Sequence, residues 1–110
     1  MTNKSEKTLL SYETVVGLEI KDENLYTSYR QAMTPLLKNY EGGFRYDFKI
    51  QETLINEDGK PINRVFLIFF KNKDKKDKFF SDPEYLKIRE TYFTPSVGSA
   101  TIISEYERFN

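Results

Sequence analysis

The run VFLIFF, from Val65 to Phe70, constrains the fold more than any other part of the chain. It is the longest strongly apolar run in the sequence, and it is far too short to span a membrane. An apolar run without polar alternation is typical of a strand whose two faces are both covered. We therefore predict a central strand over residues 63–71, in a sheet that needs a layer of structure on each side.

A first strand is predicted near the amino terminus. Residues 12–20, YETVVGLEI, are rich in β-branched side chains and alternate with the period of a strand. One predicted face carries Tyr12, Thr14, Val16, Leu18 and Ile20, and the other carries Val15, Gly17 and Glu19.

A helix follows, because residues 22–40 change to helical spacing. Asp22 is the predicted N-cap, and Gly42 and Gly43 are the predicted stop signals. Pro35 should kink the helix or mark where its regular part ends. The apolar stripe consists of Leu25, Tyr29, Ala32, Met33, Leu36, Leu37 and Tyr40.

The segment FRYDFKIQETLI, residues 44–55, alternates as a second strand. Asp58 followed by Gly59 is a hairpin signal, which indicates a turn between this strand and the central one. The predicted apolar face is Phe44, Tyr46, Phe48 and Ile50, and the predicted polar face is Arg45, Asp47, Lys49 and Gln51.

The second half of the chain predicts helical structure and a last strand. Residues 72–80 form a charged segment that could be a short helix. Ser81 and Glu84 have the spacing of a capping box, and Pro83 suits a first helical turn. The stripe of the helix that follows is Tyr85, Ile88, Arg89 and Tyr92, and residues 100–107 form the last predicted strand.

The resulting order, β-α-β-β-α-β, predicts an α+β ferredoxin-like fold with a four-stranded antiparallel sheet and both helices on one face. We expect a single domain over residues 1–110, with residues 1–7 disordered. The second face of the sheet would then expose an apolar patch. A two-fold homodimer with its sheets face to face, a dimeric α/β barrel, would cover that patch and could enclose a cavity between the sheets.

Composition excludes several classes of function. The 17 basic and 17 acidic residues balance, so we expect neither nucleic acid nor a membrane as a partner. The chain has no Cys and no His, which rules out thiolate chemistry and the commonest metal ligands. We predict no metal site, no cofactor and, in the absence of a leader-like apolar segment near Met1, a cytoplasmic location.

Five residues are candidates for binding a ligand, and each has a structural alternative. Arg45, Arg64 and Arg89 offer planar donor groups suited to an anion or carbonyl oxygen. Arg45 could instead be solvated, Arg64 could reach solvent from its strand end, and Arg89 could pack along its helix. Glu19 could be a partly buried base or an ordinary paired carboxylate, and Tyr85 offers a hydroxyl.

The segments YTSYRQAMTPLLKNYEGGF, residues 26–44, and FFSDPEYLKIRE, residues 79–90, resemble a family of small bacterial proteins of unknown function, domain-of-unknown-function family thirteen-thirty, within the dimeric α/β-barrel superfamily. The hairpin around residues 56–63 looks longer than in that family, and the carboxyl-terminal end differs from it. The resemblance implies a dimer of ferredoxin-like subunits and implies no agreed reaction. The matching residues are Tyr29, Pro35, Tyr40, Gly42, Gly43, Ser81, Pro83, Glu84, Tyr85 and Arg89.

Three functional hypotheses remain open from the sequence. The first is a homodimer that binds a small apolar or aromatic ligand between its sheets. The second is a cofactor-independent monooxygenase or isomerase-like enzyme, since superfamily relatives include such oxygenases; haem, which other relatives handle, would need a Tyr or Met ligand here. The third is a structural or interaction module without catalysis.

Overall fold

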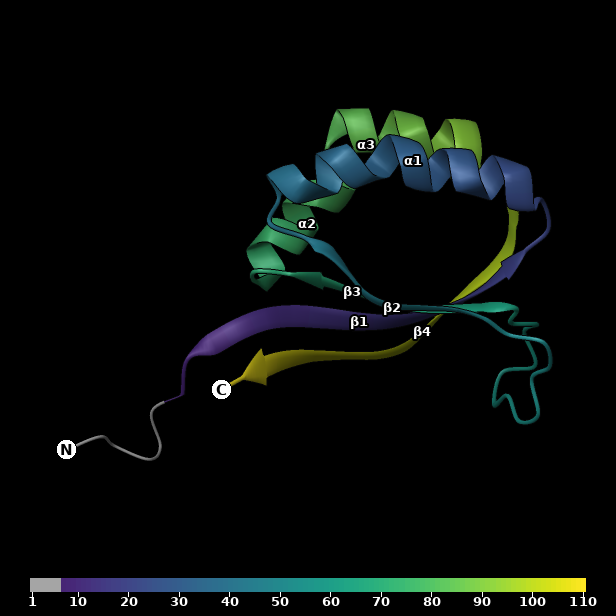
Figure 1. The fold of residues 1–110 in the computed structure, drawn as a ribbon, viewed down its shortest axis with the longest axis horizontal. Helices are drawn as coiled ribbons and strands as arrows, with labels where there is room; N and C mark the ends of the chain where they lie inside the picture. The colour runs from purple at the N-terminus through teal and green to yellow at the C-terminus, as the bar shows by residue number, and fades with distance from the viewer. Residues whose placement is uncertain (1–6) are drawn as a thin grey trace.

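The computed structural model describes residues 7–110; the predicted disorder of residues 1–7 falls outside these residues except for Lys7. Four strands and three helices follow one another, and a π-helical turn, η1, comes before the last strand (Figure 1). The elements are β1 (Leu9–Ile20), α1 (Glu23–Asn39), β2 (Gly43–Lys49), β3 (Arg64–Phe70), α2 (Lys73–Ser81), α3 (Pro83–Ile88), η1 (Arg89–Phe93) and β4 (Val97–Phe109).

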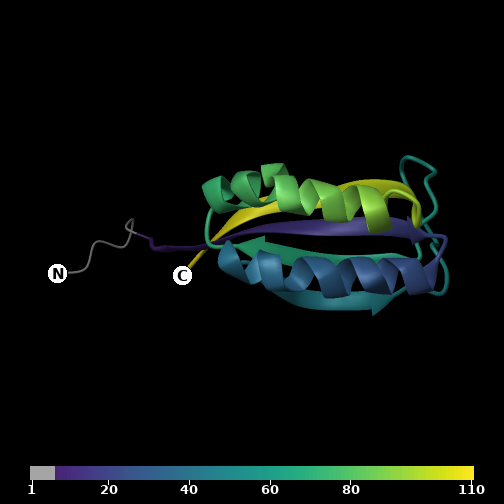
Figure 2. The same ribbon diagram turned by 90° about the horizontal axis from the view of Figure 1, so that it is seen from above.

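The strands form one antiparallel sheet in the order β2-β3-β1-β4, and the predicted central strand is an inner strand of it. Figure 1 shows all the helices above the sheet, and Figure 2 shows α1 side by side with α2 and α3 in that single helical layer. This arrangement confirms the predicted ferredoxin-like α+β fold. We call the sheet surface beneath the helices the helix face and the opposite surface the open face.

The first helix begins as predicted, because the Asp22 side chain accepts the backbone N–H of Leu25 at 2.9 Å. It continues through Pro35 to Asn39, so the proline does not end it. The residue with left-handed backbone at the stop is Glu41, with φ of 55°, rather than Gly42. Gly42 is needed for close packing instead, because a Cβ there would lie 2.7 Å from the Leu37 Cδ1 atom.

A β-bulge in β2 corrects the predicted faces of that strand. Phe44 pairs with Ile68 of β3, but Tyr46 pairs with the next residue, Leu67, so Arg45 is inserted between them. The insertion reverses the alternation after Phe44, and it turns Asp47 toward the helices. The strand also ends at Lys49, and the predicted continuation through residues 50–55 is part of the loop to β3.

The predicted capping box at Ser81 is wrong. Ser81 is the last residue of α2, and its hydroxyl donates back to the Asp77 carbonyl at 2.8 Å. Asp82 is the N-cap of α3 and accepts the Glu84 backbone N–H at 2.8 Å, while Pro83 occupies the first turn as predicted. The Asp82 carboxylate also accepts the Tyr40 hydroxyl, and this bond joins the end of α1 to the start of α3.

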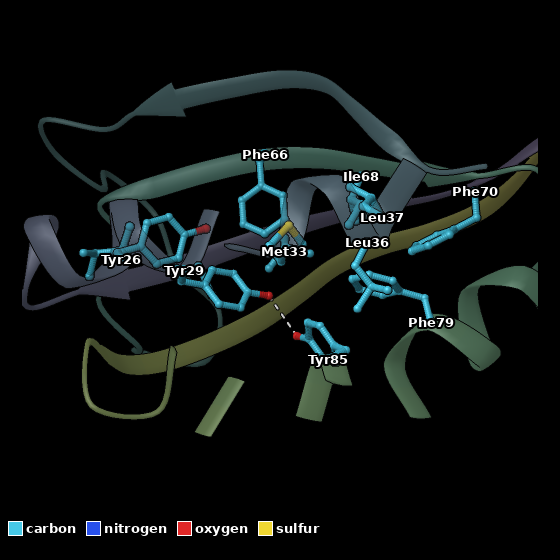
Figure 3. Packing of buried hydrophobic residues seen from close by; sticks show 13 residues of the cluster. Tyr26, Tyr29, Met33, Leu36, Leu37, Phe66, Ile68, Phe70, Phe79 and Tyr85 are labelled. Atoms are coloured by element: carbon cyan, nitrogen blue, oxygen red, sulfur yellow. Dashed lines mark hydrogen bonds between the residues drawn. The ribbon is translucent and has the colours of Figure 1, made fainter. Parts of the chain in front are cut away.

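The core lies between the helices and the helix face of the sheet (Figure 3). Aromatic side chains dominate it, and the Phe79 ring has its centroid 4.5 Å from that of Tyr85 and 5.5 Å from that of Phe70. The buried apolar side chains on the helix face of β1 and β3 are Val16, Leu18, Ile20, Phe66, Ile68 and Phe70.

Candidate functional site

A cavity of about 500 Å³ lies on the helix face, within one chain. Val16 and Ile68 of the inner strands line it from below, and Ala100 and Ile102 of β4 line it at the edge of the sheet. Met33 of α1 lines it from the helical layer, together with residues of α2, α3 and η1. The sequence predicted a cavity between the sheets of two chains; this one lies between the sheet and the helices of a single chain.

Two tyrosine hydroxyls meet on the cavity wall. Tyr29 of α1 and Tyr85 of α3 lie with their hydroxyl oxygens 2.8 Å apart, and both side chains are buried (Figure 3). Burial raises the pKa of the Tyr29 hydroxyl far above its ordinary value, and burial also raises that of Tyr85. Both hydroxyls are therefore protonated near neutral pH, so the pair can offer hydrogen bonds and is unsuited to act as a base.

Arg89 lines the same cavity from the first residue of η1. The π-helical turn is closed by a 2.9 Å bond from the Thr94 N–H to the Arg89 carbonyl. Tyr85, Arg89 and Phe93 lie four residues apart and all line the cavity. The Arg89 guanidinium lies 5.7 Å from the centre of the Phe93 ring. The Arg89 side chain is exposed, so the cavity is open to solvent where Arg89 borders it.

A second polar cluster borders the cavity beneath α1. The Arg64 guanidinium donates to both carboxylate oxygens of Asp47, at 2.8 and 3.0 Å, and the Arg30 guanidinium lies 3.0 Å from the same carboxylate. Burial alone would raise the pKa of Asp47, but these two arginines hold it below its ordinary value. Arg30 lines the cavity and packs 3.8 Å from the centre of the Phe44 ring.

The open face carries a buried carboxylate of its own, Glu13, which is 1% exposed. It accepts hydrogen bonds from the hydroxyls of Ser11 and Tyr106 at 2.6 and 2.8 Å, and from the Arg45 guanidinium at 2.8 Å. Arg108 lies 3.7 Å from it. Burial raises the pKa of Glu13, but the hydrogen bonds and the charge of Arg45 outweigh burial and bring it below its ordinary value.

The structure brings together two of the five predicted residues, Tyr85 and Arg89, at the cavity. Arg64 is not solvated at a strand end, since its side chain is 14% exposed and paired with Asp47. Arg45 is on the open face with Glu13, also away from the cavity. Glu19 is half-buried and pairs with Ser99 of β4 in the sheet, far along β1 from Glu13.

Sequence reasoning missed three residues of these clusters. Tyr29 was assigned to the apolar stripe of α1, and nothing in that stripe distinguishes a core tyrosine from one that presents its hydroxyl to a cavity. Arg30 was not considered. Glu13 could have been found, because an acidic residue in the middle of a strand that is otherwise apolar or hydroxylic must be paired if it is buried.

Neither a metal site nor a membrane-spanning helix is present in the part of the chain that the structure describes. Among residues 7–110, no three acidic side chains gather closely enough to hold a metal ion. The helices in the same range are too short and too polar to cross a bilayer. The cytoplasmic location stays a prediction.

Comparison with known proteins finds one family and several structures. Residues 14–106 match the family described as "Domain of unknown function (DUF1330)". No curated protein matches the sequence.

Solved structures resemble the fold over nearly its whole length. A protein of unknown function from Rhodopseudomonas palustris is 11% identical, with a TM-score of 0.74 over 97% of this chain and 88% of that one. A dabb family protein with a ferredoxin-like fold from Mesorhizobium loti is 10% identical, with a TM-score of 0.68 over 96% and 100% of the two chains.

A third structure, from Bacteroides thetaiotaomicron, is named "Putative antibiotic biosynthesis monooxygenase". It is 14% identical, with a TM-score of 0.57 over 90% of this chain and 88% of that one. At these identities the likeness of the three structures concerns the fold alone.

Proposed function

The chain belongs to the DUF1330 family, a family of unknown function, and on that premise we propose that it binds a small apolar or aromatic molecule between its sheet and its helices. One observation carries the proposal: a cavity of about 500 Å³ within a chain of only 110 residues, lined mostly by apolar and aromatic side chains. Protein interiors are close-packed, so space of this size is unusual unless something occupies it. Ligand sites typically combine apolar walls with a few polar groups, as here.

Titration with the neutral fluorophore phenylnaphthylamine tests the proposal. We expect a fluorescence increase that saturates in the micromolar range, because the probe leaves water for an apolar cavity. Ala100→Phe should abolish the increase, since Ala100 is an exposed residue of β4 at the cavity edge and a phenyl group there would block entry. Ala100→Ser, which adds little bulk, is the matched control and should bind the probe as the wild type does.

The proposal is contradicted if the probe does not bind, or if Ala100→Phe binds it as well as wild type while remaining folded by circular dichroism. Either result would favour the third hypothesis from the sequence, a structural or interaction module.

We further propose that the protein is a homodimer formed by the open faces of two sheets. Beside the Glu13 cluster this face carries a shallow apolar depression, whose lining includes Val15, Val65 and Leu67. Tyr46 and Phe48 stack there with ring centroids 5.8 Å apart, and both are more than half exposed. An exposed apolar patch with a polar margin is typical of an interface, and a two-fold axis lets one patch cover another of the same kind.

Sedimentation equilibrium at micromolar concentration tests the dimer. We expect Leu67→Asp to yield a monomer, because it would place two unpaired charges in the centre of a desolvated interface. Leu86→Asp is the matched control, since Leu86 is a 44%-exposed residue of α3 on the helical side of the molecule. A wild-type monomer at this concentration would contradict the dimer proposal and leave the cavity proposal standing.

A cofactor-independent oxygenase is the second candidate function. The name of the Bacteroides neighbour favours it over other reactions, and the chain has no His or Cys to support metal or thiolate chemistry. In such an enzyme the bound molecule itself would have to react with O₂. Oxygen consumption with an aromatic ligand and no added cofactor would support this function; binding without consumption would leave the protein a ligand carrier or sensor.

A further inference from the structure

One hydroxyl proton on the cavity wall has no acceptor among residues 7–110. Tyr29 and Tyr85 each form one side-chain hydrogen bond, and it is the bond between them. Whichever hydroxyl donates, the proton of the other is left over, although each side chain is at most 5% exposed. A buried donor without an acceptor is unfavourable, so the cavity is suited to a molecule that brings an acceptor oxygen.

Arg89 is also uncommitted. It is the only arginine within the described range that has no carboxylate at ion-pair distance, and its guanidinium lies 5.7 Å from the centre of the Phe93 ring. The other arginines are paired: Arg30 and Arg64 with Asp47, Arg45 and Arg108 with Glu13. A planar guanidinium matches two oxygens of one anionic group in a way that a lysine does not.

The Tyr85 hydroxyl and the Arg89 guanidinium border the same cavity. Tyr85 and Arg89 are one helical turn apart and both line the cavity. The charge of Arg89 acts on the Tyr85 hydroxyl, where it opposes the rise in pKa that burial causes. Both groups therefore face the volume that a ligand would occupy.

The other charged residues at the cavity are committed elsewhere in the described chain. Lys76 pairs with Glu105 at 2.5 Å, and Asp77 pairs with Lys73 at 3.0 Å. Arg30, which also lines the cavity, lies 3.0 Å from the Asp47 carboxylate that it shares with Arg64, and its Nη2 atom has no well-aligned hydrogen bond. The charge at the cavity that lacks a carboxylate at ion-pair distance is therefore the positive charge of Arg89. This sign favours an anion and disfavours a cationic ligand.

We propose that the ligand of this cavity is a flat apolar molecule with one anionic oxygen group, a carboxylate or an acidic phenol, held by the Arg89 guanidinium and the free hydroxyl of the Tyr29–Tyr85 pair. This inference rests on the proposed function and adds the chemical class of the ligand. The aromatic wall of the cavity would contact the ring system, and Arg89 would meet the anionic group at the exposed end.

The test compares two probes of nearly equal shape, the naphthoate anion and its neutral amide, naphthamide, by isothermal titration calorimetry. We expect naphthoate to bind about tenfold more tightly than naphthamide, because a charge-assisted contact is roughly twice as strong as a neutral one. Arg89→Met should remove that preference and leave naphthamide binding within about twofold of wild type. Added salt should weaken naphthoate binding to wild type more than to the variant.

Lys87→Met is the matched control, because Lys87 is an exposed residue of α3, two positions before Arg89, and it does not line the cavity. It removes the same charge from the surface and should leave naphthoate binding unchanged. The double variant Tyr29→Phe, Tyr85→Phe is a second test of the site, because either single change would still leave one hydroxyl proton without an acceptor. Naphthoate binding should weaken several-fold, with thermal unfolding measured alongside to confirm that the variant is folded.

The outcomes separate the two proposals. Equal affinity for both probes, or naphthoate binding that is unaffected by Arg89→Met, would overturn the anionic class while leaving the cavity as a binding site. An equal loss in Lys87→Met and Arg89→Met would overturn it too, because the effect would then be one of overall charge. Binding of neither probe would contradict the proposed function, and the inference with it.

Discussion

The two faces of the sheet differ in how they exclude water, although the same strands build both. On the helix face, β3 presents Phe66, Ile68 and Phe70 to a layer of aromatic side chains. On the open face, the deepest group is the carboxylate of Glu13, which is enclosed by hydroxyls and guanidinium groups.

The helices cover one face of the sheet, and no element of residues 7–110 covers the other. Apolar contacts with the helices stabilise the helix face, and its leftover space is the cavity. The open face keeps Tyr46 and Phe48 more than half exposed beside the paired charge of Glu13. A face with a satisfied polar centre and exposed aromatic residues is suited to a second layer, which we propose to be another copy of the chain.

The largest difference between the faces should appear when an aromatic ring is removed from the helix face. Phe70→Ala should lower the free energy of unfolding by about 4 kcal/mol, because Phe70 is 1% exposed and its loss leaves a cavity in the core. Urea unfolding followed by circular dichroism measures the change. A loss below about 1 kcal/mol would show that this core is loosely packed and would weaken the contrast between the faces.

Removing the buried carboxylate tests the open face. Glu13→Ala should lower the free energy of unfolding by about 2 kcal/mol, since two arginines and two hydroxyls lose their partner and the arginines are only partly buried. Glu19→Ala, in the same strand, is the control and should change it by less than about 0.5 kcal/mol. Equal effects of the two substitutions would contradict a special role for Glu13.

The same carboxylate predicts the direction of pH dependence. The folded-state pKa of Glu13 lies below its ordinary value, so its contribution is present above about pH 4.3 and is lost as the pH falls through the folded pKa. Wild type should therefore lose stability as the pH falls below about 4.3 more steeply than Glu13→Ala in urea unfolding. Parallel curves would assign the acid sensitivity to other carboxylates, Asp47 first among them.

A smaller effect on the helix face should come from the start of α3. Asp82→Ala removes the N-cap and the acceptor of the Tyr40 hydroxyl, and should lower the melting temperature by a few degrees. Ser81→Ala should lower the melting temperature less, because the Ser81 hydroxyl only donates hydrogen bonds to carbonyls within its own helix. The reverse order would restore the capping box predicted from sequence.

The smallest effect on unfolding should come from a ring on the open face. Phe48→Ala should change the free energy of unfolding of the monomer by less than about 0.5 kcal/mol, because the side chain is 51% exposed. It should nonetheless raise the dissociation constant of the dimer about tenfold, measured by sedimentation. A large loss of monomer stability, or an unchanged dimer, would show that the open face is not the incomplete one.

Much of the fold could be predicted because local patterns and the final structure agree. The strand around Val65–Phe70, the cap at Asp22 and the order of elements all rest on periodicity and on short-range hydrogen bonds. The sequence predicted Ser81 as the N-cap of α3, but the cap is Asp82. Serine and aspartate are both good N-caps, and the position where α2 ends decides between them.

The bulge at Arg45 could not be predicted in this way. Strict alternation placed Tyr46 with Phe44 and assigned Asp47 to the wetter face, but an inserted residue leaves no mark in the hydrophobic period. The bulge decides which face each later side chain of β2 lies on. Asp47 lies on the helix face, where it pairs with Arg30 and Arg64, and Tyr46 lies on the open face.

The residues of the candidate site also fall into two groups, those that local patterns predict and those that depend on how the layers pack. Local patterns account for the order of the main elements and for two residues of the site, Tyr85 and Arg89, because these depend on neighbours in the chain. The packing of the layers sets the rest: Tyr29 meets Tyr85 across 56 positions of sequence, Glu13 meets Arg45, and space remains between sheet and helices. These are contacts between side chains of different elements, and they depend on how the layers pack, which local periodicity does not encode.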